Sequence, residues 1–367
     1  MELKSKQAKK IAEDPVKTAE FAHLIYLKEE QLSIVRKRHG RGFVYFENDK
    51  KITDKSQLQR FKDLVIPPAW EDVRISSIEN GHLQVVGKDA KGRKQYHYHP
   101  HWNQIRNSTK FARMAEFGKS LPGIREAVEK DLRKRTMTKE KCLALVIRLM
   151  EETHIRIGSD QYAKENKTFG LSTMRTRHLM TEDGEMEFHF TGKKGKKHKV
   201  PLHDKKLRKL VIQCEEIPGW ELFQYYDEEG NHHSIDSGMV NEYLKEISED
   251  FFTAKDFRTW AASKIFLETI LDFDPAQKES EIEKNIVEAC NTAAEKLGNT
   301  RTVCRNYYIH PGLIEKYKEG KLEKYIQKKT SSESSDFLEP LEEALLEIIE
   351  KHRFQIGEEE KADYCSK

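Results

Sequence analysis

Hydrophobic and polar positions follow two different periods along the chain. Between Gly42 and about Trp102, short apolar or aromatic runs alternate with turn residues. The runs lie at residues 42–46, 82–86 and 95–99. They predict strands, and the paired prolines in 66–70 exclude a helix between them. This part of the chain therefore predicts a small β-rich domain.

After about Asn103 the hydrophobic period becomes helical. One set of apolar residues recurs at i, i+3, i+4 and i+7: Leu143, Val146, Ile147 and Met150. That spacing predicts a buried helix face. Two strand-like runs, 188–190 and 198–200, flank a turn rich in Gly and Lys, which predicts a hairpin. We expect an α+β protein, in which a larger and mostly helical domain with a β-hairpin follows the β-rich one.

The end of the chain differs in charge from the rest. Residues 331–367 hold eleven Asp/Glu against four Lys/Arg, a net charge of −7. The whole chain carries +3, so the remainder carries +10, which favours a polyanionic partner. Four apolar residues of this tail have helical spacing: Leu338, Leu341, Leu345 and Ile348. They predict an amphipathic helix that packs on the body or on a partner, while the acidic charge allows competition with that polyanion.

Composition excludes several classes of protein. The five cysteines are widely spaced and form no CxxC pair, so neither a disulfide framework nor a zinc site is expected. The fifteen histidines form no recognisable ligand set with carboxylates or cysteines. No run of about 18 apolar residues predicts a membrane span. We expect a protein of a reducing intracellular compartment with no bound metal.

Candidate chemistry lies at a tyrosine near the end of residues 297–311. Upstream of Tyr308 are Asn299 and two arginines, and three further cations come from distant segments: Arg156, Lys193 and Arg258. A phenol has an ordinary pKa near ~10, so it needs activation to act as a nucleophile. A phosphate under attack needs its growing negative charge neutralised. Tyrosine with cations from several segments is therefore typical of attack on a phosphodiester.

Several motifs occur in an order that resembles a known family. The N-terminal ones are IPPAW at 66–70, NGHLQ at 80–84 and GRKQYHYHP at 92–100. The C-terminal ones are RIG at 156–158, TFGL at 168–171, GK at 192–193, KDFRTW at 255–260 and the Tyr308 segment. Together they resemble the DNA topoisomerase IB family, in its compact poxvirus-like and bacterial branch, over roughly residues 40–312. The resemblance implies a β-rich DNA-clamping domain and a helical catalytic domain that form a C-shaped clamp on DNA.

The resemblance also implies catalytic roles. Tyr308 would be the nucleophile that forms a 3′-phosphotyrosyl intermediate, and its neighbour Tyr307 a packing residue. Arg156 and Arg258 would stabilise the transition state, since a guanidinium can hold two phosphate oxygens at once. Asn299 would donate to a phosphate oxygen, although its position equally suits a cap of the following helix.

Lys193 would be the general acid that protonates the leaving 5′ oxygen. The chain departs from the family at the next position, because Lys194 stands where members often have Asp. This departure leaves open whether Lys194 or Lys196 shares the general-acid role.

DNA contacts are implied for residues of the β-rich domain and for one lysine of the helical domain. Strand alternation places Tyr96 and Tyr98 on one face and Gln95 on the other. All three resemble major-groove contacts, and without the family a buried aromatic face would be an equal interpretation. Lys255 resembles a position close to the scissile phosphate.

The chain is thus expected to be a type IB topoisomerase, an isomerase that relaxes supercoiled DNA. No P-loop motif occurs, and we expect no ATP and no required cofactor, a divalent cation at most stimulating the reaction. The expected partner is double-stranded DNA and no membrane, with a monomer acting in the cytoplasm on a bacterial nucleoid. The domains expected are a basic arm at 1–40, the DNA-clamping domain at 41–103, the catalytic domain at 104–330 and the tail at 331–367. A tyrosine site-specific recombinase and a non-catalytic DNA-binding protein remain alternatives.

Overall fold

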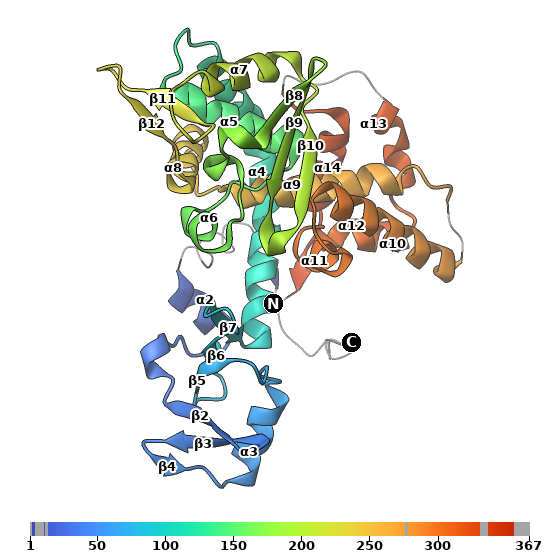
Figure 1. Cartoon of the computed structure of the whole chain (residues 1–367). Helices are drawn as coiled ribbons and strands as arrows, with labels where there is room; N and C mark the ends of the chain where they lie inside the picture. Colours follow the sequence, from blue (N-terminus) through green and yellow to red (C-terminus); the bar gives the residue numbers. More distant parts are fainter. Residues whose placement is uncertain (1, 4–10, 12–13, 276–277, 331–336, 356–367) are drawn as a thin grey trace. The chain divides into compact units, whose positions relative to one another are not determined.

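The computed structural model describes residues 2–3, 11, 14–275, 278–330 and 337–355. The chain divides into two compact units, one of residues 1–113 with 353–367 and one of residues 114–352. A small sheet followed by a helical core confirms the expected α+β class (Figure 1). The expected change of domain at 103/104 falls inside one continuous helix, α4 (Pro100–Leu132). Helical periodicity begins there, whereas the packing divides the chain further along the same helix.

The first unit is built on a six-stranded antiparallel sheet in the order β4-β3-β2-β5-β6-β7. Its strands are β2 (Ile34–His39), β3 (Gly42–Glu47), β4 (Lys50–Lys51), β5 (Glu71–Ile75), β6 (Leu83–Lys88) and β7 (Lys94–Tyr98). The unit also holds α2 (Pro15–Phe21), a 3₁₀ turn η1 (Glu29–Gln31), α3 (Lys55–Asp63) and the pair β1 (Glu2–Leu3) with β13 (Phe354–Gln355). The strands predicted from apolar runs at 42–46, 82–86 and 95–99 are β3, β6 and β7, with ends that differ by at most two residues.

The sheet begins inside the range expected to be a basic arm. β2 lies within the sheet, paired with β3 on one side and β5 on the other. Its Arg36 is buried, and one guanidinium nitrogen donates to the carbonyls of Pro67 and Trp70 at 3.1 and 2.7 Å. The arm predicted at 1–40 is therefore too long, because β2 with its buried Arg36 belongs to the sheet.

Helices surround a small sheet in the second unit. Its helices are α5 (Lys139–Thr153), α6 (Asp160–Asn166), α7 (Lys205–Glu215), α8 (Ser237–Ser248), α9 (Ala254–Ile270), α10 (Glu279–Lys296), α11 (Arg301–Tyr307), α12 (Pro311–Lys318), α13 (Ile326–Thr330) and α14 (Pro340–Glu350), with most of α4. Short 3₁₀ turns are η2 (Leu171–Thr173), η3 (Thr176–His178), η4 (Lys193–Gly195) and η5 (Glu323–Tyr325). The strands are β8 (Leu179–Glu182), β9 (Glu185–Thr191) and β10 (Lys197–Pro201) in one sheet, and β11 (Gln224–Tyr226) with β12 (His232–Ser234) in another. The predicted hairpin is β9–β10.

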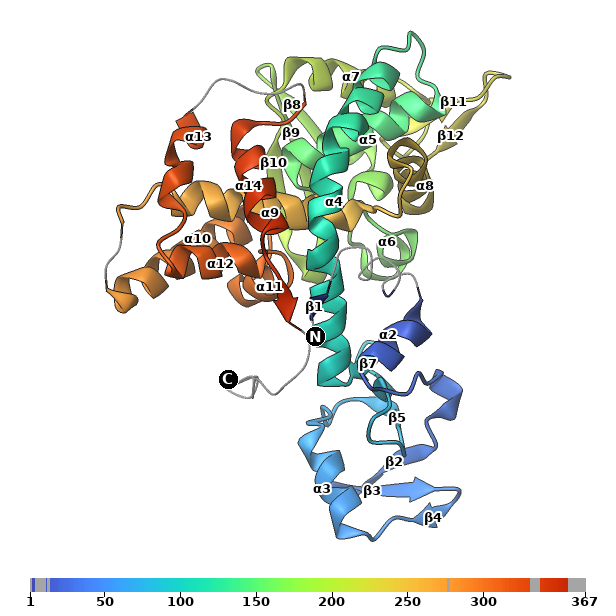
Figure 2. The same cartoon turned by 180° about the vertical axis from the view of Figure 1, so that it is seen from behind.

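Helix α9 lies in the middle of the second unit and packs on α5, α8, α10, α12 and α14 (Figure 2). The ring of Phe117 on α4 lies 5.0 Å from Phe257 and 6.1 Å from Trp260, both on α9, in edge-to-face contacts. Buried aromatic side chains contribute large apolar areas and prefer such tilted geometry. These contacts fix α9 against the long helix α4.

The acidic end of the chain forms a structural helix of this unit. Leu341, Leu345 and Ile348 are buried on one face of α14, as the apolar spacing predicted, and the helix packs against α9, α12 and α13. Residues 331–336 and 356–367 of the expected tail lie outside the described part of the chain. Residues 337–352 of the expected tail thus belong to the second unit, on which their apolar face docks, and residues 353–355 belong to the first.

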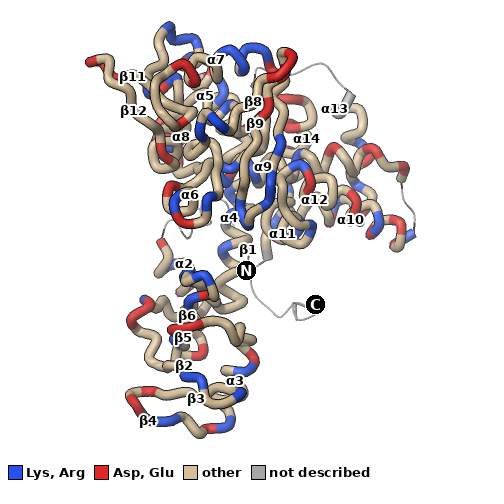
Figure 3. Tube along the Cα trace, in the orientation of Figure 1, with Lys and Arg blue, Asp and Glu red and all other residues tan. Residues whose placement is uncertain are grey.

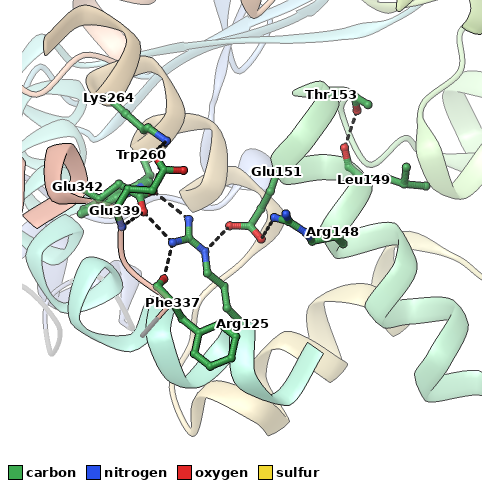
Figure 4. A network of polar contacts seen from close by, with 10 residues as sticks. All are labelled: Arg125, Arg148, Leu149, Glu151, Thr153, Trp260, Lys264, Phe337, Glu339 and Glu342. Atoms are coloured by element: carbon green, nitrogen blue, oxygen red, sulfur yellow. Dashed lines mark hydrogen bonds and ion pairs between the residues drawn. The ribbon is translucent and has the colours of Figure 1, made fainter. Parts of the chain in front are cut away.

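A buried carboxylate connects α14 to α4 and α9 (Figure 4). Glu342 is 1% exposed and accepts from both terminal nitrogens of Arg125 at 2.7 and 2.8 Å and from the indole of Trp260 at 2.9 Å. Arg125 also donates to Glu151 on α5 at 3.0 Å. Although burial opposes ionisation, Arg125 and Lys264 hold the pKa of Glu342 at about 2. The network joins the four helices α4, α5, α9 and α14 through the ion pair of Arg125 and Glu342.

We predict that Glu342→Gln destabilises the protein by about 3 kcal/mol, because the partly buried Arg125 loses one of its two carboxylate partners. The matched control is Glu347→Gln on the same helix, since Glu347 pairs with Lys351 at 2.7 Å in a solvent-exposed position. An exposed pair contributes at most ~1 kcal/mol. Urea unfolding of both variants measures the difference. Equal, small effects would show that the network does not hold α14 in place.

Candidate active site

Arg156 lies just beyond the C-terminus of α5, in a segment that is hydrogen-bonded to the backbone of residues 168–171. Its carbonyl accepts from Leu171 N at 2.9 Å. The two segments touch at Gly170, where a Cβ would lie 2.4 Å from the carbonyl oxygen of Arg156. Only glycine fits this approach, which explains why TFGL at 168–171 accompanies the arginine. Burial lowers the pKa of the half-buried Arg156 side chain.

Arg258 on α9 is buried, and its guanidinium faces the candidate nucleophile. One terminal nitrogen donates to the carbonyl of His154 and the other to that of Leu297, the latter at 2.7 Å. Its guanidinium carbon lies 5.7 Å from the centre of the Tyr308 ring, within cation–π range. Burial and the neighbouring Arg156 cation lower the pKa of Arg258 to about 10. The side chain is still a cation at neutral pH, with two of its three nitrogens used to hold it in place.

Tyr308 follows α11 directly and is held by its backbone on two sides. Its N–H donates to the carbonyl of Cys304 at 3.0 Å, and its carbonyl accepts from the hydroxyl of Ser263 at 3.2 Å. The same hydroxyl accepts from His310 N at 3.0 Å. Because Ser263 and Arg258 both belong to α9, one helix holds the tyrosine backbone and places a cation at its ring.

The neighbouring Tyr307 lies in a different environment. Its side chain is 45% exposed, so the expectation that it is a packing residue is wrong. Successive helical residues point about 100° apart, so the side chains of Tyr307 and Tyr308 take different directions. That of Tyr307 points toward solvent rather than into the core. Of the two tyrosines, Tyr308 is the one next to Arg258.

Asn299 bonds to the first arginine instead of capping the next helix. Its Oδ1 accepts from a terminal nitrogen of Arg156. The N-cap of α11 is Thr300, whose hydroxyl accepts from Val303 N at 3.4 Å. The capping alternative for Asn299 is therefore excluded, and the predicted proximity to Arg156 is found.

Two buried donors at this cluster have no acceptor in the described part of the chain. They are Nε of Arg258 and Nδ2 of Asn299. A buried donor without an acceptor costs about 1–3 kcal/mol. A phosphate oxygen would accept from both, so the cluster fits an anion that the protein itself does not supply.

Lys193 occupies η4, between β9 and β10. Its side chain is exposed, like those of its neighbours Lys194, Lys196 and Lys197, so the turn is strongly basic (Figure 3). Lys194 has a left-handed backbone with φ of 64°. Within the described residues, no hydrogen bond or ion pair joins Lys193 to the cluster of Arg156, Arg258, Asn299 and Tyr308.

Two side chains near the cluster were not predicted. Ser263 was missed because a serine in a helix interior carries no local signal, although it lies five residues after Arg258 on the same helix. His198, on β10, was considered only as a metal ligand. Burial and the cations Lys196, Arg156 and Arg258 lower the pKa of His198.

The candidate DNA contacts of the first unit lie on β7, with the predicted alternation. Tyr96 and Tyr98 have stacked rings 6.1 Å apart, and Gln95 donates instead to Asp89 at 3.0 Å. The hydroxyl of Tyr96 donates to Glu29 at 2.8 Å, so an acid adjoins this face.

The fourth candidate contact, Lys255, belongs to the second unit. It lies in the first turn of α9, three residues before Arg258, and its side chain is exposed.

Among the described residues, no group of three His, Cys, Asp or Glu side chains could hold a metal ion. No helix in this part of the chain is long and apolar enough to cross a membrane.

Comparison with known proteins identifies the family. The family model for the catalytic core of eukaryotic DNA topoisomerase I matches residues 99–335, and the model for the N-terminal domain of bacterial DNA topoisomerase IB matches residues 42–89. The chain belongs to the type IB DNA topoisomerases. It is thus an enzyme of the isomerase class, as the motifs predicted.

Individual relatives agree with this assignment. The DNA topoisomerase 1B of Acanthamoeba polyphaga mimivirus is 31% identical over 77% of this chain and 87% of its own length. The DNA topoisomerase 1B of Vaccinia virus is 24% identical over 74% of this chain and 82% of its own. The similarity covers most of this chain and most of each relative. It confirms the predicted membership of the poxvirus-like and bacterial branch.

A histidine beside the site gives a prediction for pH. Burial, followed by Arg258 and two lysines, lowers the pKa of His154 from 6.5 to about 4. As the pH falls from about 6.5 to about 4, the unfolded chain takes up a proton that the folded chain resists, so stability is lost in this window. His154→Asn should reduce the slope of unfolding free energy against pH in this window, because the titrating imidazole is removed. Asn is the replacement of choice because it tolerates the left-handed φ of 54° at this position.

The control for this prediction is His23→Asn. His23 also has a left-handed backbone, with φ of 55°, but it is exposed. Urea unfolding between pH 7 and 4 should give this variant the wild-type slope. A wild-type slope in His154→Asn as well would contradict the shifted pKa.

Proposed function

We propose that this enzyme relaxes supercoiled duplex DNA by transient cleavage of one strand, with Tyr308 as the nucleophile. The observation that carries the proposal is the buried guanidinium of Arg258, 5.7 Å from the Tyr308 ring. The phenol oxygen attacks a backbone phosphorus, and the bond to the 5′ oxygen breaks. The products are a 3′-phosphotyrosyl ester and a free 5′ hydroxyl.

Arg156, Arg258 and Asn299 stabilise the five-coordinate transition state. Charge develops on the non-bridging oxygens, and donors fixed in advance stabilise that charge without reorganisation. The two unsatisfied buried donors, Nε of Arg258 and Nδ2 of Asn299, support this role. The amide accepts from Arg156 with its oxygen, which leaves its nitrogen to donate.

Lys193 is the general acid. The departing 5′ oxygen is a poor leaving group as an alkoxide, so it takes a proton from the lysine as the P–O bond breaks. The exposed position of Lys193 at the tip of a hairpin supports this role, because a bound backbone can reach it.

Resealing needs no external energy source. The phosphotyrosyl ester conserves the energy of the broken bond, so the 5′ hydroxyl attacks it after the free end has rotated. DNA torsion drives the net reaction. We therefore propose that neither ATP nor a cofactor is required, with a divalent cation at most stimulating the rate.

The partner is double-stranded DNA, bound by a monomer through residues of both units. Gln95, Tyr96 and Tyr98 contact the duplex from the first unit, and Lys255 from the second. Phosphate contacts supply most of the affinity, so binding weakens as salt rises. The match of residues 42–89 to a bacterial domain supports action on a bacterial nucleoid in the cytoplasm.

The test is relaxation of a supercoiled plasmid without ATP and in EDTA. The plasmid carries no recombination site, so relaxation argues against a site-specific recombinase. Denaturation during the reaction should leave DNA covalently bound to protein, which a non-catalytic binding protein cannot produce. Absence of both results would overturn the proposal.

We predict that Tyr308→Phe abolishes relaxation and covalent trapping but keeps the affinity for duplex DNA, because only the attacking oxygen is lost. Tyr307→Phe is the matched control, since it removes the hydroxyl of the adjacent, exposed tyrosine and should keep relaxation. Plasmid relaxation and filter binding measure the two properties. Loss of relaxation in Tyr307→Phe alone would reverse the assignment.

We predict that Lys193→Ala slows cleavage of an ordinary phosphodiester by ~10²–10⁴-fold, the usual contribution of general-acid catalysis. A substrate with a 5′-bridging sulfur should be cleaved at nearly the wild-type rate, because a thiolate leaves without protonation. Single-turnover cleavage of both substrates measures the ratio. Equal defects would remove Lys193 from the acid role and direct attention to Lys194 and Lys196.

A further inference from the structure

The ring of His198 is held inside the β9–β10 hairpin. His198 pairs with Phe190 across the two strands, and their rings stack with centres 5.0 Å apart and planes 13° apart. The adjoining strand residues Lys197 and Lys199 are exposed, whereas His198 is half-buried. The hairpin therefore directs this side chain toward the protein.

Two glycines contact the same ring from different segments. A Cβ on Gly192 would lie 2.7 Å from Cδ2 and Nε2 of His198, and a Cβ on Gly298 would lie 2.6 Å from its Cε1. Both distances are shorter than real Cβ contacts, so the ring fits only because neither residue has a side chain. His198 thus fills the space between the hairpin and the α10–α11 connection.

Each glycine directly precedes a proposed catalytic residue. Gly192 precedes Lys193, and Gly298 precedes Asn299. The electrostatic influence of Arg156 and Arg258 on His198 supports the same location beside the phosphate site. One ring therefore contacts the backbone next to the general acid and the backbone next to a phosphate donor.

We propose that His198 is a positioning residue, which fixes the Lys193 hairpin against the Asn299 segment so that both act on one phosphate. This inference rests on the proposed function. Misplacement of a catalytic group by ~1 Å can cost on the order of 10²-fold in rate. Loss of the ring would therefore impair mainly the step that depends on Lys193, the protonation of the leaving oxygen.

The test measures single-turnover cleavage by His198→Ala on an ordinary substrate and on one with a 5′-bridging sulfur. We expect a loss of roughly 10²-fold on the first. We expect the second to restore most of the rate, because it bypasses protonation. The control is His189→Ala in the same hairpin, whose ring bonds to Glu187 at 2.6 Å and which should cleave both substrates normally.

A second variant tests the packing itself. Gly192→Ala adds a methyl group against His198, at a backbone φ of −94° that alanine adopts without strain. Alone it should reproduce the defect of His198→Ala. Combined with His198→Ala it should add little, because the ring that it displaces is already gone. Thermal unfolding of each variant checks that the fold is retained.

The outcomes separate this inference from the proposed function. If sulfur rescues Lys193→Ala but His198→Ala is equally impaired on both substrates, the positioning role is overturned while the general acid stands. Wild-type cleavage by His198→Ala, or full additivity with Gly192→Ala, would also overturn it. If sulfur fails to rescue Lys193→Ala, the proposed general acid fails first.

Discussion

The rest of the site depends on the hydrogen bonds that hold the buried guanidinium of Arg258. This guanidinium is bound by the carbonyls of His154, at the end of α5, and Leu297, at the end of α10. A cation can be buried only where hydrogen bonds compensate for its lost hydration. The same bonds therefore fix the segments that lead to Arg156 and Asn299. One charge both forms part of the site and determines where its other members lie.

Helix α9 gives this charge a rigid support. Besides Arg258 it carries Ser263, which holds the backbone of Tyr308, and Trp260, which bonds to the carboxylate of Glu342 on α14. One helix thus carries both the arginine beside the Tyr308 ring and contacts with the packed interior. Precise placement of catalytic groups requires this kind of support from packed neighbours. The acidic helix α14 packs on α9 and bonds to it through Glu342, so it supports the helix that carries Arg258.

How much could be predicted from sequence depended on whether the signal was local. Ordered motifs identified the family, and the resemblance selected Arg156, Arg258, Asn299 and Tyr308, which the structure brings together. Periodicity gave the strands, the hairpin and the docking face of α14. The burial of Arg36 in the sheet could not be predicted, because a buried arginine and a solvated one have the same sequence pattern. The contact of His198 with Gly298 also has no local signal, since the two residues lie a hundred positions apart.

The central claim is that Tyr308 attacks DNA beside the buried arginine. Its most direct test is mass spectrometry of the covalent complex formed on a supercoiled plasmid and trapped by denaturation. After digestion with nuclease and trypsin, the peptide of residues 306–316 contains both adjacent tyrosines, so fragmentation must assign the modified one. The account predicts a nucleotide phosphate on Tyr308. A nucleotide on Tyr307 or on any residue outside this peptide would contradict it.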